Sequence, residues 1–470
     1  MKAYWEGKRE LFSGLAIEQL EKNNPDAFKP YPVFNFDFNG EYYENTSIEK
    51  VLNQHLSKWE EIYGDKYKDE TLGYRFERLL EMAAEMTGRR CAVLADEYDK
   101  PLLDTMEDQH RAAHTQAVLK GFFSRLKKAD DFIRFIFITG VTRLNEVSLF
   151  SDVDQLRDIS LSADYANLCG ITREELHRYF EDETGALAER RKMTAEECEA
   201  ALRKQYDGYY FHPDSESVYN PYSLFGALLD KDFGSYWFET GTPTFLTGKC
   251  KDTGFDVRKL TDGTLYAGEG TLKNYTGYSL EPVPLLYQTG YLTITDYDRD
   301  VREYTLAFPN EEVKYGFVEC LMHEFVANCG AGSGNDIFTL RRYIEQGELD
   351  RIKDVLTSLF ANITCTPETD SSEHVFQTVI YLVFTLLGKF TLCEMHTYSG
   401  RIDCKVETKK YIYLFEFKRD GSANEALKQI DTKDYALAFA ADSRKVIRIG
   451  VSFDSQTRKL QDWKVSDTTC

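Results

Sequence analysis

Two acids and a lysine near the C-terminus have the types and spacing that phosphodiester cleavage requires. If residues 411–418 form a strand, alternation places Glu416 and Lys418 on one face, and Asp403 on the preceding strand meets Glu416 across the hairpin. Two carboxylates can hold a hard cation such as Mg²⁺ or Mn²⁺, with positions left for water and phosphate, while an ammonium orients the water. These residues therefore predict metal-dependent hydrolysis of a phosphodiester.

The same residues also have a purely structural interpretation. A strand that ends in Glu-x-Lys is typical of a solvated edge with cross-strand charge pairs. Ile412 and Leu414, however, put Glu416 and Lys418 at the end of an otherwise apolar face. Because charges on a buried face need partners or a metal ion, the pattern favours a functional site.

Three further side chains near this segment are weaker candidates. Glu394, on the expected preceding strand, is either a third metal ligand or water-orienting base, or an ordinary exposed acid. Arg401 fits a bidentate contact to phosphate, although an arginine beside an acid also forms structural salt bridges. Gln429 would either touch the backbone of a substrate strand or lie in solvent. The residues alone leave these alternatives open.

The elements expected around these residues follow a definite order. Apolar periodicity predicts a helix, three strands, a helix and a last strand, at residues 374–389, 391–396, 400–406, 411–418, 423–439 and 446–453. This α-β-β-β-α-β order, together with Asp403 and the triplet Glu416-Phe417-Lys418, resembles the PD-(D/E)XK nuclease superfamily. The resemblance implies a restriction-endonuclease-like core in which Asp403, Glu416 and Lys418 are catalytic. Its metal would be Mg²⁺ or Mn²⁺, and its substrate nucleic acid, with DNA favoured over RNA.

A second group of acids follows a strand in the N-terminal part. Residues 90–95 are a short apolar run that ends at Asp96 and Glu97, and residues 132–139 are another that ends at Thr139. With the helical stretch 108–128 between them, these runs indicate βαβ units and a parallel sheet, whose carboxyl edge presents Mg²⁺ ligands and water-activating bases. Alternatively, the acidic turn at residues 96–99 only caps the next helix.

This part of the chain resembles the AAA-ATPase-like domain that is often fused to a PD-(D/E)XK module. The resemblance implies that Asp96 and Glu97 are Walker B acids and that Thr139 and Arg143 occupy the sensor region. A family member would carry a glycine-rich Gly-Lys-Ser loop ahead of the first residues of this chain, so we expect a degenerate nucleotide site at which ATP binding is weak or lost. The segments that carry the resemblance are residues 11–17, 31–38, 140–151, 206–211, 219–224, 236–246 and 286–292.

The organisation predicted for the whole chain is α/β in three parts. Residues 1–205 form an incomplete P-loop-like parallel-sheet domain, residues 206–365 a mixed α+β middle region, and residues 366–470 the nuclease-like domain. In and before the middle region, a helical stretch is expected at 182–204, strands within 279–298 and 304–308, and helices at 310–328 and 336–360.

Composition narrows the classes of function. The net charge of −21 argues against a general nucleic-acid binder, but residues 401–470 carry +3 and the preceding 400 residues carry −24. The ten cysteines lack zinc-site spacing, and no apolar run of eighteen residues or signal peptide is present, so we expect a cytoplasmic protein without a membrane partner.

Two functions remain from the sequence. The first is a nuclease, a phosphodiester hydrolase attached to an ATPase-like module without ATPase activity. The second is a non-catalytic scaffold that binds protein or nucleic acid; the acidic first 400 residues favour it. A protein partner is also expected if the edge of the N-terminal sheet needs cover.

Overall fold

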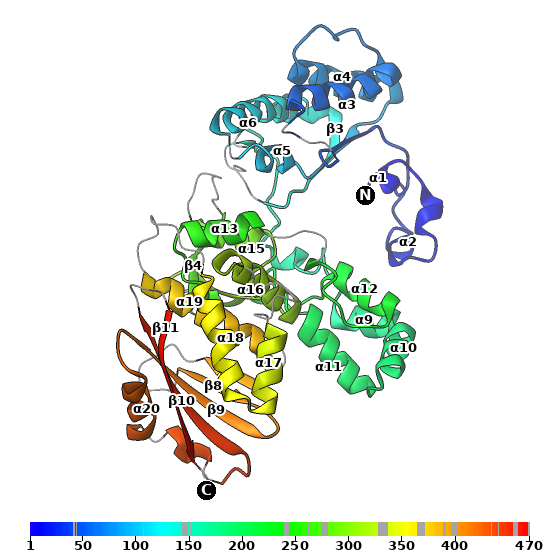
Figure 1. The fold of residues 1–470 in the computed structure, drawn as a ribbon. Helices are drawn as coiled ribbons and strands as arrows, with labels where there is room; N and C mark the ends of the chain where they lie inside the picture. Colours follow the sequence, from blue (N-terminus) through cyan, green and yellow to red (C-terminus); the bar gives the residue numbers. More distant parts are fainter. Residues whose placement is uncertain are drawn as a thin grey trace. The chain divides into compact units, whose positions relative to one another are not determined.

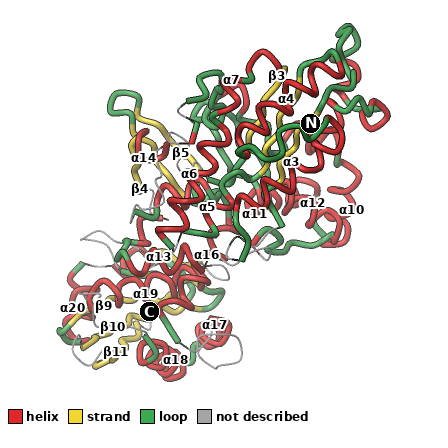
Figure 2. The backbone as a smooth tube through the Cα atoms, turned by 90° about the horizontal axis from the view of Figure 1, so that it is seen from above, coloured by secondary structure: helices red, strands yellow, loops and turns green. Residues whose placement is uncertain are grey.

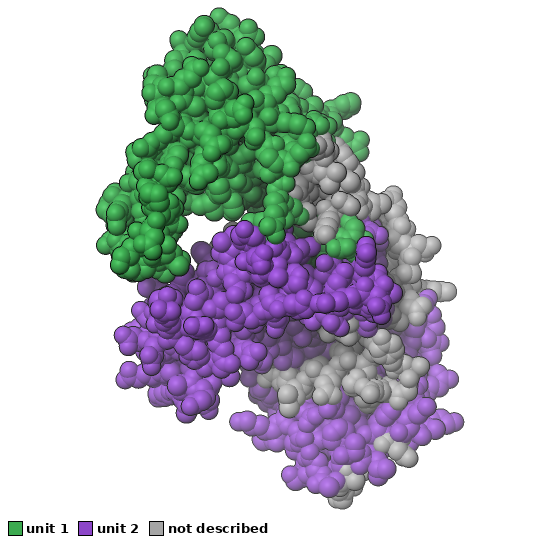
Figure 3. Space-filling view, turned by 180° about the vertical axis from the view of Figure 1, so that it is seen from behind, with its two compact units in different colours: residues 1–159, 268–279, 283–289 green, residues 160–267, 280–282, 290–470 purple. Residues whose placement is uncertain are grey.

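The computed structural model divides the chain into two compact units, which Figure 3 shows in different colours. Unit 1 comprises Met1–Ile159, Gly268–Ser279 and Val283–Thr289, and unit 2 the remainder. Among the described residues, no helix is long and apolar enough to cross a membrane. The structure describes residues 1–40, 43, 45–106, 108–142, 149–150, 152–238, 244–260, 264–273, 281–327, 337–363, 372–388, 392–395, 403–433, 435–439, 441–454 and 459–468.

Unit 1 contains a parallel sheet of three strands in the order β1-β2-β3. The strands are β1 (Val33–Asp37), β2 (Cys91–Asp96) and β3 (Ile133–Ile138). The two strands predicted around Asp96 and Thr139 are therefore present, and β1 adds a third. Pairing of Asp37 with Asp96 aligns the carboxyl ends of β1 and β2, so the residues that follow both strands share one edge of the sheet.

Helices join the strands of this sheet (Figure 1). β1 is followed by α3 (Ile48–Tyr63) and α4 (Leu72–Thr87), and β2 by α5 (Lys100–Leu103) and α6 (Gln109–Phe123). The single helix predicted at 108–128 is in fact two, because α6 ends before Ser124. The other short elements are α1 (Lys2–Trp5), η1 (Arg9–Phe12), α2 (Ala16–Leu20), α7 (Arg125–Lys128), η2 (Asp130–Phe132), α14 (Glu269–Lys273) and α15 (Val283–Gln288).

An aromatic core fixes the helices on the sheet. Phe34 and Phe36 of β1 are both fully buried, and the ring of Phe36 lies edge-on to Phe76 of α4 and to Phe122 of α6. A buried ion pair crosses between α3 and α4, where the Arg75 guanidinium forms two parallel hydrogen bonds with the Glu60 carboxylate. Since both side chains are 5% exposed, each charge depends on the other for compensation.

The middle of the chain differs in two places from the pattern predicted. The helical stretch at 182–204 forms two helices, α10 (Glu181–Arg191) and α11 (Ala195–Tyr206), separated by Lys192 in the left-handed conformation. The expected strand segment 279–298 includes a helix, α15, before β5 (Thr293–Asp298), because a short apolar run such as residues 283–286 is ambiguous by periodicity alone.

The remaining middle elements include a three-stranded sheet of order β4-β6-β5. Its other strands are β4 (Leu265–Gly268) and β6 (Glu303–Ala307). Helices and short turns account for the rest: η3 (Ala163–Tyr165), α9 (Arg173–Tyr179), α12 (Pro221–Asp230), α13 (Thr244–Asp252), η5 (Val257–Leu260) and α16 (Glu311–Phe325).

Three helices lead into the C-terminal sheet. The stretch predicted as one helix at 336–360 is two, α17 (Ile337–Gln346) and α18 (Leu349–Ala361), because Gly347 has φ +78° and ends the first. A Cβ at Gly347 would lie 2.6 Å from the Tyr411 ring, so only glycine fits this turn. The third helix is α19 (Ser372–Leu387). It begins and ends two residues earlier than the helix predicted at 374–389.

The C-terminal sheet has five strands in the order β11-β10-β9-β8-β7. Figure 1 labels β8 to β11, and Figure 2 shows β9, β10 and β11 from above. Its elements are β7 (Leu392–Met395), β8 (Cys404–Glu407), β9 (Tyr411–Arg419), α20 (Ala423–Thr432), η6 (Tyr435–Phe439), β10 (Lys445–Asp454) and β11 (Lys459–Thr468). The helix predicted at 423–439 therefore stops at Thr432. The prediction that 446–453 is the last strand is wrong, because β11 pairs antiparallel with β10.

Opposite faces of β9 pack on different helices. On one face, the ring centroids of Phe415 and of Phe384 in α19 are 5.1 Å apart. On the same face, the Tyr413 hydroxyl donates a hydrogen bond to the carbonyl of Ile344 in α17. On the other face, Ile412 and Leu414 form a buried cluster with Ile430 of α20. The sheet thus lies between α20 and the preceding helices, and the face that bears Glu416 is the one that α20 covers.

Candidate active site

The end of β9 carries the acid and the lysine. Alternation continues the face of Ile412 and Leu414 to Glu416 and Lys418, as the sequence predicted. Glu416 is 1% exposed, whereas the Lys418 side chain is 29% exposed. The structure therefore buries the carboxylate and leaves the ammonium accessible at the edge of the same face.

Asp403 lies immediately before β8, opposite Glu416. Cys404 pairs with Phe415, so continuing the antiparallel register by one residue brings Asp403 level with Glu416. The Oδ2 atom of Asp403 accepts a 2.8 Å hydrogen bond from the backbone N–H of Phe417. This bond fixes the Asp403 carboxylate to β9 and brings the two acids together across the hairpin.

Lys418 bridges the carboxylate and the helix above it. Its Nζ atom lies 3.3 Å from Oε1 of Glu416 and donates a 2.5 Å hydrogen bond to Oε1 of Gln429 in α20. The alternative that Gln429 is a solvated helical residue is wrong, because its side chain is half-buried and holds the ammonium. A sequence signal was present, since Gln429 falls beside Ala426 and Ile430 on the buried face of α20.

Burial and like charge disfavour ionisation of the two acids. The pKa of Glu416 is raised from its ordinary value of 4.5 to about 7, first by burial and then by the Asp403 carboxylate, although Lys418 opposes the shift. The pKa of Asp403 is also raised by burial, against the effects of the Phe417 N–H and Lys418. A cation at this position would remove both penalties.

One oxygen of the site lacks compensation. Oε2 of Glu416 is buried and has no hydrogen-bond partner within the described part of the chain. A buried carboxylate oxygen of this kind normally binds a donor or a metal ion. The donor set of Asp403 and Glu416, two carboxylates side by side, therefore fits a hard divalent cation such as Mg²⁺ or Mn²⁺.

Tyr435 is a site residue that the sequence did not reveal. Tyr435 of η6 packs against the buried cluster that contains Leu414 and Ile430, on the face of β9 that carries Glu416. Burial raises the pKa of Tyr435, and the charge of Glu416 raises it further. Tyr435 comes after the end of α20, and no local pattern in the sequence marks it as a site residue.

The third proposed ligand is placed only by its backbone. Glu394 pairs with Lys405 of β8, and Lys405 pairs with Leu414 of β9, so the Glu394 position belongs to the face of Glu416. Its side chain, and all of Arg401, lie outside the described residues. In the part of the chain that is described, no group of three or more His, Cys, Asp or Glu residues has a metal-binding arrangement.

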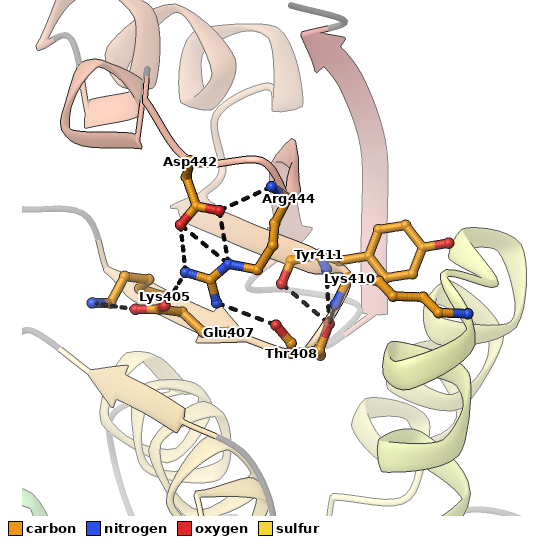
Figure 4. A network of polar contacts seen from close by, with 7 residues as sticks. All are labelled: Lys405, Glu407, Thr408, Lys410, Tyr411, Asp442 and Arg444. Carbon is orange, nitrogen blue, oxygen red and sulfur yellow. Dashed lines mark hydrogen bonds and ion pairs between the residues drawn. The ribbon is translucent and has the colours of Figure 1, made fainter.

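The opposite end of the β8-β9 hairpin is held by an ionic network, shown in Figure 4. The guanidinium of Arg444, just before β10, contacts Glu407 at 2.8 Å and Asp442 at 2.6 Å, and Glu407 also pairs with Lys405 at 2.9 Å. Thr408 closes the turn by accepting from the backbone N–H of Tyr411. The network locks the register that sets Asp403 opposite Glu416.

The structure also brings together two of the N-terminal candidates. The Thr139 hydroxyl donates a 2.5 Å hydrogen bond to Oδ1 of Asp96, across the carboxyl ends of β3 and β2. Glu97 follows in the left-handed region, with φ 51°, and its pKa is raised by burial and by the charges of Asp96 and Asp99. Arg143 lies outside the described residues.

The alternative that this acidic turn only caps the next helix does not hold for the side chain of Asp99. Its carboxylate makes no capping bond to α5. Instead it is fully buried and accepts from the Thr142 backbone N–H, the Thr142 hydroxyl and the Val141 backbone N–H. Asp99 therefore ties β2 to the segment after β3, which keeps Asp96 and Thr139 adjacent.

Comparison with known proteins gives matches at both ends of the chain and over nearly its whole length. A family model described as "Predicted AAA-ATPase" matches residues 1–150, and one described as "PD-(D/E)XK nuclease superfamily" matches residues 371–463. A protein of Azotobacter chroococcum mcd 1, described as "Uncharacterized protein in vnfD 5'region", is 30% identical over 463 residues, which cover 97% of this chain and 86% of that protein. No solved structure matches.

Proposed function

This chain belongs to the family of proteins that join a predicted AAA-ATPase domain to a PD-(D/E)XK nuclease superfamily domain, and on that premise we propose that it is a metal-dependent nuclease. The observation that carries the proposal is the buried Oε2 of Glu416, which lacks a partner among the described residues and lies beside Asp403 and Lys418. A nuclease needs this combination of a paired acid site and a nearby ammonium.

The proposed reaction assigns a task to each side chain. Asp403 and Glu416 hold Mg²⁺ or Mn²⁺, with Glu394 as a further ligand, and the bound ion supplies Lewis-acid stabilisation and a more acidic water. Lys418 orients the attacking water and stabilises the charge that develops on the phosphate oxygens. Gln429 holds Lys418 in place through their hydrogen bond.

The substrate we propose is nucleic acid, with DNA favoured over RNA. Residues 401–470 carry a net charge of +3, whereas the first 400 residues carry −24, so a polyanion would approach the C-terminal region most easily.

We also propose a cytoplasmic location and the division of the chain at residues 205 and 365. The acidity of the first 400 residues favours the second candidate, a scaffold that binds its partner without cleaving it.

A cleavage assay separates these two functions. The full chain is incubated with single- and double-stranded DNA and with RNA, in Mg²⁺, Mn²⁺ or EDTA, beside Asp403→Asn and Lys418→Ala. Lys428→Ala is the matched control, since it removes an exposed lysine from α20. Cleavage that needs metal and is lost in the two site variants supports the nuclease, while unchanged cleavage in either variant overturns the assignment.

A further inference from the structure

The C-terminal sheet ends in two edge strands of different length. β7 has four residues, whereas β11 has ten and, among the described strands, pairs with β10 alone. Each described side chain of β11 is exposed or half-buried, although residues 412–416 of β9, two strands away, are buried. An edge of this length with one side open is a template for pairing with another strand.

The middle of β11 carries two opposite charges around a tryptophan. Asp462 and Lys464 lie on one face of the strand, and Trp463 lies between them on the other face. Within the described part of the chain, neither charge has an ion-pair partner. The Trp463 backbone N–H donates a 2.9 Å hydrogen bond to Oδ1 of Asp462, so this acid contacts only its own strand. Both charges are therefore available to a partner.

The charges of β11 are complementary to those of a second, antiparallel β11. When the pairing is centred on Trp463, that residue lies opposite itself, and each Asp462 lies opposite the Lys464 of the other copy. Opposite charges directly across a strand pair stabilise it. A register shifted by one residue sets Asp462 opposite Val465 or Trp463 and loses both ion pairs. The charge pattern therefore selects one register.

The same register aligns the two nuclease-like sites. Trp463 pairs with Val451, and Val451 pairs with Phe417, which lies between Glu416 and Lys418. A two-fold axis through the Trp463 pair and perpendicular to the sheet places both sites on one face and at the same level along the strands. The two copies of β9 are then five strand spacings apart, which is about 24 Å.

We propose that β11 pairs with β11 of a second copy of this chain, in the antiparallel register centred on Trp463. The resulting dimer has one continuous sheet across both copies. Main-chain hydrogen bonds join the two edges, the Asp462–Lys464 ion pairs fix the register, and the two Trp463 side chains meet at the centre. No residue of the nuclease-like site takes part in this contact, so the inference does not depend on the proposed function.

The test is sedimentation velocity of the full chain over a range of protein concentrations, and wild type should form a dimer. Asp462→Lys sets like charges opposite each other at both symmetric positions, so it should weaken dimerisation about tenfold or more, as should Lys464→Asp. The double variant Asp462→Lys, Lys464→Asp restores opposite charges and should dimerise within a few-fold of wild type. Lys409→Asp reverses an exposed charge before β9 and should leave dimerisation unchanged.

Each outcome bears on the proposal. A wild-type chain that stays monomeric at every concentration overturns it and leaves the edge of β11 to another occupant. A dimer that neither single variant weakens also overturns it, because the contact then lies elsewhere. The double variant separates charge pairing from damage to the fold. Recovery of the dimer supports the register, whereas a loss at least as large as in the single variants contradicts it.

Discussion

Nζ of Lys418 lies 3.3 Å from Oε1 of Glu416, a carboxylate that the fold buries to 1% exposure. The pair projects from the same face of β9, two residues apart, and α20 covers that face. A buried acid whose ion pair is with a partly exposed lysine is costly for stability unless another cation joins it.

Lys418→Ala should abolish cleavage while preserving the fold. The ammonium is the group that stabilises developing phosphate charge, and loss of one such group lowers rates by at least about 100-fold. The measurement is the single-turnover rate on the best substrate, with circular dichroism to verify folding. A rate within a few-fold of wild type, with Lys428→Ala as the reference, would show that Lys418 has no part in the chemistry.

Gln429→Ala should reduce the cleavage rate by about 10- to 100-fold through loss of positioning, with metal affinity unchanged. Within the described part of the chain, Gln429 hydrogen-bonds to Lys418 and to no other charged group of the site, so the effect should depend on Lys418. The check is a double-mutant cycle. Once Lys418 is alanine, Gln429→Ala should have no further effect, and additive losses would contradict the positioning role.

Metal binding should depend on pH because the raised pKa of Glu416 favours its protonated form below about pH 7 in the metal-free chain. With its pKa raised to about 7, mainly by burial and then by Asp403, the proton must leave before a cation binds. Affinity for Mn²⁺ should therefore rise as pH increases toward 7 and level off above it. Calorimetry in buffers of different ionisation enthalpy measures the released proton. The same affinity at pH 5.5 and pH 8 would be the contrary result.

The same shift predicts how stability depends on pH. The pKa of Glu416 in the folded chain lies above its ordinary value of 4.5, so the folded state binds this proton more tightly than the unfolded state does. The resulting contribution to the free energy of unfolding is fully present below about pH 4.5 and is lost as pH rises through about 7. The loss is on the order of 3 kcal/mol. Urea unfolding in EDTA at pH 5 and pH 8 should show it in wild type and not in Glu416→Gln. An equal decline in both proteins would assign it to other groups.

Breaking the Arg75–Glu60 pair should destabilise unit 1 strongly. Arg75→Met leaves the Glu60 carboxylate buried without its partner, which costs about 3 to 5 kcal/mol. Arg125→Met, which breaks a more exposed pair with Glu77, is the control and should cost about 1 kcal/mol or less. Thermal unfolding measures both. Restoration of stability in Arg75→Met, Glu60→Leu would confirm that the unpaired charge is the cause.

Local patterns in the sequence predicted the part of the C-terminal site that depends on alternation. The run from Ile412 to Lys418 alone determines which side chains share a face, and the hairpin determines that Asp403 approaches Glu416. The contact between Lys418 and Gln429 depends instead on how α20 returns over the sheet. That return is set by packing of Ile430 on Leu414, which no local pattern encodes.

Other differences between the predicted and the observed elements also arise where local sequence patterns carry no signal. β11 was missed because residues 459–468 are largely polar, and their strand conformation comes from pairing with β10. The break after α10 occurs at Lys192, a left-handed residue that lacks the usual glycine signal. Asp99 finds its partners at Val141 and Thr142, more than forty residues away, so the sequence could not distinguish this link from a helix cap.

The central claim is that Asp403 and Glu416 form a metal site, and calorimetric titration of Mg²⁺ and Mn²⁺ tests it most directly. The wild-type chain is compared at pH 8 with the double variant Asp403→Asn, Glu416→Gln, which keeps the shape of both side chains. We predict saturable binding with micromolar to millimolar dissociation constants in wild type and none in the variant. Identical titrations of the two proteins would contradict the account and favour the non-catalytic scaffold.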